Sequence, residues 1–243
     1  MRAAALTLAL LAGCATQSAG DQPARGVGTI LAEMKSACGG DAWDRVQGWH
    51  ETGVVEVPGR PPMDHQVWHD MRSLKTAMVT RLNDRIVRHS GFNGTTYWQV
   101  GPDGTVQTGR DEAKLRSQLR DTFLSSAGWF FPERFPAAVA LAGTETSDGK
   151  LMDVLRITPE GADSFDLWVD RDTHRIRRIV AGNEFAELSD YRMFGGVCSA
   201  TRGRQGDGQP GHDIVLHVQT VETDAPIPAA VFEPTTRLLP SRE

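Results

Sequence analysis

Apolar and polar residues alternate with a period of two along most of this chain, which is the pattern of strands that bury one face. Such segments recur from 48 to 82, from 86 to 108 and from 139 to 223, separated by clusters of Gly, Pro, Asn and Asp. Asn93-Gly94 is the strongest of these turn signals. The short spacing predicts antiparallel pairing, because parallel strands need crossover connections of a dozen or more residues.

Two segments have a helical period instead. Apolar residues recur every three or four positions in 27–36, and in 111–126 they include Leu119 and Phe123. Gly203 to Gly211 is rich in Gly and polar residues and is predicted to be a mobile loop. The fold class expected is therefore mainly β (α+β). It is one curved antiparallel sheet, an open half-barrel of about ten to eleven strands, packed on helices.

The start of the chain has a different pattern. Arg2 precedes an apolar run that leads through Ala12 and Gly13 into Cys14. The run is about half of the roughly 20 residues that cross a bilayer as a helix, so it predicts a signal peptide rather than a transmembrane anchor. The small residues before Cys14 form a lipobox, in which the Cys becomes the acylated N-terminus of a bacterial lipoprotein. The alternative is an ordinary short signal that contains a Cys by chance.

These features predict the organisation of the whole chain. Residues 1–13 are the signal peptide, 14–26 a flexible tether and 27–243 a single domain. The mature protein is expected in the bacterial cell envelope, held by its N-terminal lipid and facing the periplasm. Ala15, rather than Asp, after the acylated Cys resembles the signal that sorts enteric lipoproteins to the outer membrane.

Composition narrows the function classes. The chain has 243 residues, a net charge of −5 and no long basic run, so nucleic-acid binding is not expected. Of its three cysteines, Cys14 is assigned to lipidation. Cys38 and Cys198 then remain either as a disulfide, which an oxidising periplasm permits, or as two separate thiols. Their spacing does not decide between the two.

No constellation for catalysis, cofactor or metal is evident. His65 and His69 lie four positions apart on one expected strand. A strand rises about 3.3 Å per residue, so the two side chains would be about 13 Å apart, too far to bind one metal ion. Polar side chains on a solvated strand face are the better interpretation of this pair. Paired carboxylates on single strands do not form an acid–base site, and the nucleophile-elbow and phosphate-loop motifs are absent from the sequence. We therefore expect no enzyme, no cofactor and no metal.

Six short motifs occur in a fixed order along the chain. They are 39–43 (Gly-Gly-x-Ala-Trp), 91–98 (Gly-Phe-Asn-Gly-x-x-x-Trp), 153–159 (Asp-Val-Leu-Arg-Ile-Thr-Pro), 167–173 (Leu-Trp-Val-Asp-x-x-Thr), 189–191 (Ser-Asp-Tyr) and 229–234 (Ala-x-Val-Phe-Glu-Pro). Together they resemble the LolA/LolB-like superfamily of periplasmic lipoprotein carriers, in the version that precedes some bacterial aspartic-protease domains. The chain has no Asp-Thr-Gly or Asp-Ser-Gly, so proteolysis is not expected.

The resemblance implies an open antiparallel half-barrel over helices, with an apolar cavity that accepts acyl chains. On that basis, the expected partner is a lipid acyl chain or a lipoprotein. The expected lining of the cleft is Trp68, Trp98, Leu119, Phe123 and Trp168. The alternative for these aromatic residues is that they are buried in the core, as most are in a globular chain. The alternative function is an envelope scaffold that binds a protein partner and has no lipid cavity.

One aromatic segment allows a second interpretation. Trp129, Phe130 and Phe131 are consecutive and lie between turn residues. They are predicted to project as a loop that touches a membrane or a partner, because exposed aromatic patches have that use.

Overall fold

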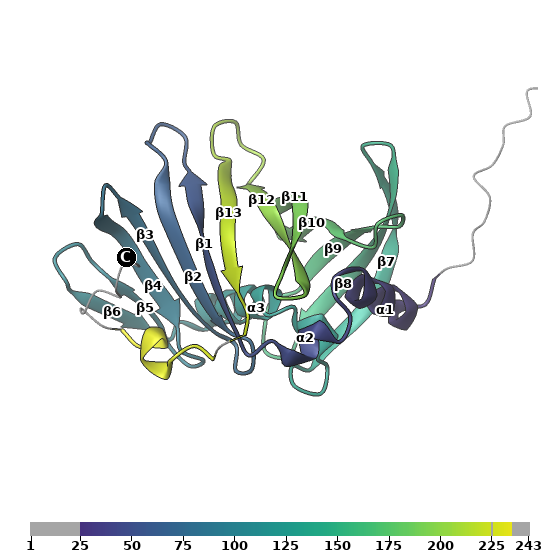
Figure 1. The fold of residues 1–243 in the computed structure, drawn as a ribbon, viewed down its shortest axis with the longest axis horizontal. Helices are drawn as coiled ribbons and strands as arrows, with labels where there is room; N and C mark the ends of the chain where they lie inside the picture. The colour runs from purple at the N-terminus through teal and green to yellow at the C-terminus, as the bar shows by residue number, and fades with distance from the viewer. Residues whose placement is uncertain (1–24, 225, 235–243) are drawn as a thin grey trace, which may run out of the picture.

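The computed structural model describes residues 25–224 and 226–234 (Figure 1). The helices are α1 (Val27–Ala37), α2 (Ala42–Arg45) and α3 (Glu112–Ser125), with 3-10 turns η1 (Gly128–Phe130) and η2 (Ala229–Phe232). The strands are β1 (Gly48–Glu56), β2 (Met63–Asp70), β3 (Lys75–Leu82), β4 (Arg85–Phe92), β5 (Tyr97–Val100), β6 (Val106–Gly109), β7 (Ala137–Ser147), β8 (Lys150–Pro159), β9 (Phe165–Asp170), β10 (Ile176–Ala181), β11 (Glu184–Phe194), β12 (Val197–Gly206) and β13 (Ile214–Glu222).

All thirteen strands of the described residues form one sheet, in the order β6-β5-β4-β3-β2-β1-β13-β12-β11-β10-β9-β8-β7. The neighbours pair antiparallel, and the sheet curves without closing (Figure 1). β1 pairs with β13, so the two halves of the chain join at the centre of the sheet. The single curved antiparallel sheet packed on helices, expected from the sequence, is confirmed.

The loop predicted at Gly203 to Gly211 is wrong in its first part. Gly203 and Gly206 belong to β12, where Gly203 pairs with Leu188 on one side and Leu216 on the other. A Cβ on Gly206 would lie 2.0 Å from Oδ1 of Asp213 and 3.2 Å from the ring of Phe185, so a larger residue would displace these side chains. Both glycines are therefore residues of a strand rather than of a loop.

Helix α3 begins and ends where its sequence predicts. The Asp111 side chain caps it by accepting a hydrogen bond from the backbone N–H of Lys114 at 3.0 Å. After the helix, Ala127 takes a left-handed conformation and turns the chain into η1. A Cβ on Gly128 would lie 2.6 Å from the ring of Phe123, so glycine lets η1 fold tightly against the helix.

The two faces of the sheet carry separate hydrophobic cores. The larger core lies between the sheet and α1, α2, α3 and η1, and includes Phe123 and Phe165. The smaller one lies on the opposite face, where η2 places Phe232 against Trp68 and Trp98. Trp98 Nε1 donates a hydrogen bond to the Phe232 carbonyl at 2.8 Å, which fixes this late segment to β5.

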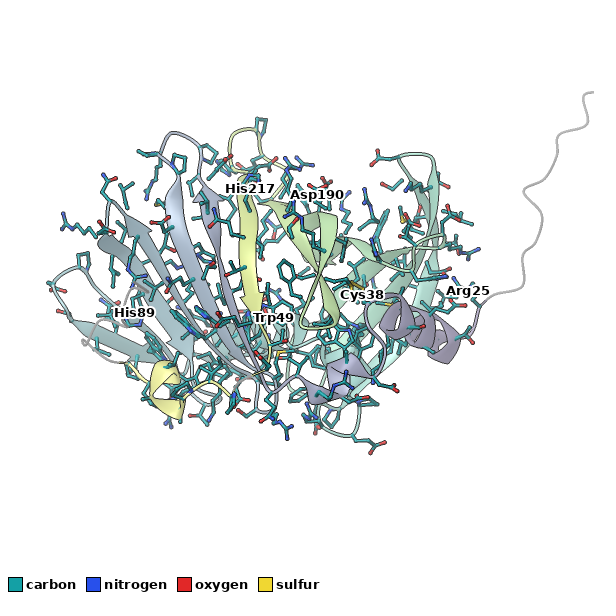
Figure 2. The ribbon with its side chains drawn as sticks, in the orientation of Figure 1. Arg25, Cys38, Trp49, His89, Asp190 and His217 are labelled. Atoms are coloured by element: carbon teal, nitrogen blue, oxygen red, sulfur yellow. A yellow bond between two sulfur atoms is a disulfide. The ribbon has the colours of Figure 1, made fainter. Side chains whose placement is uncertain are left out.

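The first described residues are held at the other end of the sheet. Arg25 and Arg171 both contact the buried carboxylate of Asp153 on β8, with N···O distances of 2.6 Å each. Arg25 and Cys38 mark the course of this segment in Figure 2. Cys14 lies outside the described residues. In the described part of the chain, no helix has the length and apolar character needed to span a bilayer.

Candidate functional site

A cavity of about 1430 Å³ lies on the face of the sheet that carries α3 and η1. Its walls come from β1 to β6 on one side, from β10 to β13 on the other, and from α3, η1 and the α1–α2 segment. Sites for small organic ligands are typically about 300–1,000 Å³, so this space is large enough for an extended ligand. It is an open trough rather than a sealed chamber.

One wall of the cavity is apolar. Strand alternation turns Ile179 of β10, Leu188 of β11 and Leu216 and Val218 of β13 toward it. Gly203 pairs with both Leu188 and Leu216, so these two leucines are separated by a position without a side chain. These side chains form a hydrocarbon strip on this wall, which polar residues such as Tyr191, Ser199 and Gln205 also line.

Aromatic rings in contact with one another continue the apolar surface at the base of the cavity. The rings of Trp43 and Trp49 are parallel with centroids 6.2 Å apart, and Phe130 lies 5.7 Å from Trp43. Trp129 follows at 5.7 Å from Phe130. The indole N–H of Trp43 donates to the Cys38 carbonyl at 2.9 Å, which holds this ring in place. The four rings form a rigid aromatic floor from α2 and β1 to η1 (Figure 2 labels Trp49).

The sheet continues from β13 into β1 to β6, and this second wall carries polar side chains. Glu51 lies opposite Val67 in the β1–β2 ladder, and His65 and His69 flank Val67 on the same face. Trp49 Nε1 donates a hydrogen bond to Glu51 Oε2 at 3.2 Å. Further along this wall, the lining side chains include Thr76, Arg88, Ser90, Gln99 and Gln107.

Burial shifts the pKa values of Glu51, His65 and His69. Desolvation lowers the pKa of His65 to about 4, with the charge of Arg88 as a second cause. Desolvation also lowers the pKa of His69 to about 4, with His65 as the second cause. Burial raises the pKa of Glu51, and the hydrogen bond from Trp49 opposes the shift only in part. At neutral pH both imidazoles are therefore uncharged.

The sequence placed His65 and His69 on a solvated strand face, and the structure corrects this. They line the cavity with Val67 between them, because residues at i, i+2 and i+4 share a face of a strand. The apolar residue between them was the only signal available, and one valine does not distinguish a cavity wall from a half-buried strand. Among the described residues, no group of three or more metal-ligating side chains is close enough to hold an ion.

Of the residues expected to line the cleft, Trp98 touches the cavity, and Trp68 does not. Both belong to the smaller core on the opposite face, under Phe232. The reason is the register of the strands. Trp68 pairs with Ala77, Ala77 with Gly91 and Gly91 with Trp98, and residues that are paired in this way point to the same face of the sheet. That face is the one away from α3. The expectation that Trp68 lines the cleft was therefore wrong, because its side chain lies on the other face of the sheet.

The other three expected lining residues do not line the cavity. Phe123 is 1% exposed and is packed into the larger core, 6.1 Å from the ring of Phe165. Leu119 is half-buried on α3 near the loop at Gly161. Trp168 lies on the other face of β9 under the guanidinium of Arg178, at 5.6 Å. The cavity face of α3 is instead the one that carries residues such as Gln118 and Leu124.

The segment Trp129 to Phe131 does not project from the protein. Trp129 and Phe131 are 7% and 9% exposed, and Phe130 is half-buried. η1 turns Trp129 and Phe130 toward the cavity, while the guanidinium of Arg134 lies 4.7 Å from the ring of Phe131. This aromatic run is part of the cavity floor and core, because the left-handed turn at Ala127 folds it inward.

Cys38 and Cys198 form a disulfide, which settles the alternative that the sequence left open. Their Cα atoms are 4.7 Å apart, and the Cys198 N–H donates to the Cys38 carbonyl at 3.0 Å. Both cysteines lie on the lining of the cavity. The bond therefore ties the α1–α2 segment and its ring Trp43 to β12.

Comparison with known proteins gives a fold. No protein-family model matches the sequence, and no curated protein matches it. Among solved structures, a LolA superfamily protein from Nitrosomonas europaea is 14% identical with a TM-score of 0.59, covering 86% of this chain and 98% of that one. A DUF1329 family protein from Desulfovibrio piger is 17% identical with a TM-score of 0.57, covering 85% of this chain and 97% of that one.

A third similar structure is a Vibrio parahaemolyticus domain whose name refers to outer-membrane lipoprotein sorting. It is 12% identical with a TM-score of 0.56, covering 84% of this chain and 94% of that one. Identities this low establish the architecture and leave the ligand to the chemistry of the cavity. The chain has the LolA-like fold, as its six sequence motifs indicate.

Proposed function

We propose that this chain is a lipid-anchored protein of the bacterial envelope that binds acyl chains, of a lipid or of a lipoprotein, in its cavity without catalysing a reaction. The observation that carries the proposal is the cavity of about 1430 Å³, with its apolar wall on β10 to β13 and its aromatic floor. Two proteins of similar structure, one of the LolA superfamily and one named for lipoprotein sorting, support the same class of function.

Physical chemistry favours hydrocarbon as the occupant of that wall. Moving a chain from water onto it contributes about 0.8 kcal/mol per buried CH₂ group. Ten buried methylenes would therefore contribute about 8 kcal/mol before the entropy of binding is subtracted. Rigid rings such as Trp43 and Trp49 provide contact area with few rotatable bonds to immobilise.

Binding is tested with the purified chain carrying Cys14→Ser, so that no anchor lipid enters the measurement. We expect N-phenyl-1-naphthylamine, an uncharged apolar fluorophore, to brighten on binding and to be displaced by dodecyl-chain lipids. Leu216→Lys places a charge on the apolar wall and should abolish this signal. His217→Lys is the matched control, because His217 is the next residue on β13 and does not line the cavity (Figure 2).

The alternative role, a scaffold that binds a protein partner, predicts the opposite outcome. If the wild-type chain neither brightens the fluorophore nor co-purifies with lipid by mass spectrometry, the carrier proposal fails. The cavity itself favours the carrier, since the scaffold role assumed a fold filled by its own side chains.

The membrane anchor is tested separately. Two acyl chains on Cys14 give stable membrane attachment, whereas one gives only reversible binding. We expect the wild-type chain to partition into the detergent phase and the Cys14→Ala chain to remain in the aqueous phase. Equal partitioning of the two would contradict lipidation at this residue.

A further inference from the structure

The two walls of the cavity differ in chemistry. Lining side chains of β10 and β13, such as Ile179, Leu216 and Val218, are hydrocarbon. On the adjoining strands, β1 presents Glu51, and β2 presents the imidazoles of His65 and His69 on either side of Val67. A purely hydrocarbon ligand would leave this second wall without hydrogen-bond partners, and buried polar groups without partners are costly.

The polar wall carries hydrogen-bonding capacity that the protein does not use. His69 Nδ1 is buried without a hydrogen-bond partner in the described part of the chain. His65 Nδ1 lies 3.2 Å from Thr80 Oγ1, and Glu51 has one contact, to Trp49. Directly opposite strand positions are about 5 Å apart and diagonal ones about 7–8 Å, so Glu51 and the two imidazoles form one patch.

Charge is balanced over the lining. Four cationic and four anionic side chains contribute to it: Arg88, Lys114, Arg120 and Arg175, and Glu51, Asp121, Glu184 and Asp207. Several are already neutralised within the protein. Arg120 pairs with Asp121 at 2.8 Å and with Glu184 at 3.6 Å. The lining therefore has no excess of either sign to select a charged headgroup.

We infer that the ligand is an uncharged amphiphile, with its hydrocarbon chain against β10 to β13 and its hydroxyl or ester oxygens against Glu51, His65 and His69. This inference rests on the proposed function, and adds the chemical class of the ligand. A neutral imidazole offers one donor and one acceptor, which suits hydroxyl and ester groups. The lowered pKa of His65 and His69 keeps both rings neutral at physiological pH.

A fatty-acid carboxylate fits this patch poorly. It would bring a negative charge beside the Glu51 carboxyl, and two carboxylates sharing one site repel each other. The neutral histidines do not offset the repulsion, and the charge of Arg88 lies on β4, three strands away from Glu51 on β1. Acylglycerols have the chain, the ester and the free hydroxyls that the two walls require.

The experiment compares 1-monolaurin with laurate as displacers of N-phenyl-1-naphthylamine from the Cys14→Ser chain at pH 8, where laurate is ionised. Both carry the same dodecanoyl chain, so the difference measures the polar group. We expect monolaurin to bind at least about tenfold more tightly, the ratio that one or two good hydrogen bonds supply. Equal affinities, or tighter binding of laurate, would overturn the inference.

Variants then locate the polar contact. His65→Leu/His69→Leu should weaken monolaurin about five- to tenfold and leave the affinity for the fluorophore unchanged. His217→Leu, outside the lining, is the matched control and should alter neither, with circular dichroism confirming the folded sheet in each. If the double variant binds monolaurin as the wild type does, the inference fails and the carrier proposal stands. If the fluorophore does not bind the wild type, both fail.

Discussion

Removing the disulfide should destabilise the protein strongly without changing its fold. Cys38 and Cys198 are 160 positions apart, so the cross-link closes a very long loop in the unfolded chain. Loop-closure entropy for a loop of this length amounts to about 5 kcal/mol at 25 °C, and measured disulfides usually contribute about 2–4 kcal/mol. We expect Cys38→Ala/Cys198→Ala to lower the free energy of unfolding by about 2–5 kcal/mol.

The native contacts at this site make the test specific. The hydrogen bond from the Cys198 N–H to the Cys38 carbonyl joins backbone atoms, so the double Ala variant retains it. With a urea m-value of about 3 kcal/mol/M, a loss of 3 kcal/mol lowers the midpoint by about 1 M. The m-value should also rise, because the uncrosslinked chain unfolds to a more expanded state.

The assay is equilibrium urea unfolding followed by tryptophan fluorescence. Oxidised wild type is compared with the double variant, and with wild type in excess dithiothreitol, which should match the variant. A midpoint that is the same in all three samples would refute the reasoning. It would mean that the cross-link constrains neither the native nor the unfolded chain.

Three further outcomes follow from buried groups. Phe123→Ala should lower the free energy of unfolding by about 3–5 kcal/mol, measured by urea unfolding, because the side chain fills the larger core; a loss below 1 kcal/mol would contradict that placement. Asp153→Ala should lower the free energy of unfolding by about 3 kcal/mol in the same assay, because it removes the buried carboxylate that two arginines contact. An unchanged midpoint would show that these ion pairs do not contribute to stability. The free energy of unfolding should fall as the pH is lowered from 6.5 to 4. In this range His65 and His69 are protonated in the unfolded chain but stay neutral in the folded protein, where each has a pKa of about 4. The raised pKa of Glu51 has the opposite effect on stability, so the wild type is compared with His65→Leu/His69→Leu. The stability of this variant should depend less on pH than that of the wild type. Parallel profiles of stability against pH would show that the histidines are not the cause.

Local patterns in the sequence determined the elements and their pairing. Alternation with a period of two, interrupted by turns such as Asn93-Gly94, predicted antiparallel hairpins, and each neighbouring pair in the sheet is antiparallel. The helix at 111–126 is present with its Asp111 cap. These features depend on interactions between residues that are near in the chain, which is why the sequence reveals them. At 203–206 the prediction was wrong, because glycine and polar residues are typical of loops, whereas here they pair with strands β11 and β13 that are distant in the chain.

The sequence also presented Cys38 and Cys198 as a possible pair, but only the fold brings residues 160 positions apart to a Cα separation of 4.7 Å. The tertiary structure likewise decided which side of each strand meets α3. Alternation identifies two faces and does not name them, because a shift by one residue exchanges every side chain between faces. Trp68 was therefore assigned to the cleft and lies under Phe232, while His65 and His69 were assigned to solvent and line the cavity.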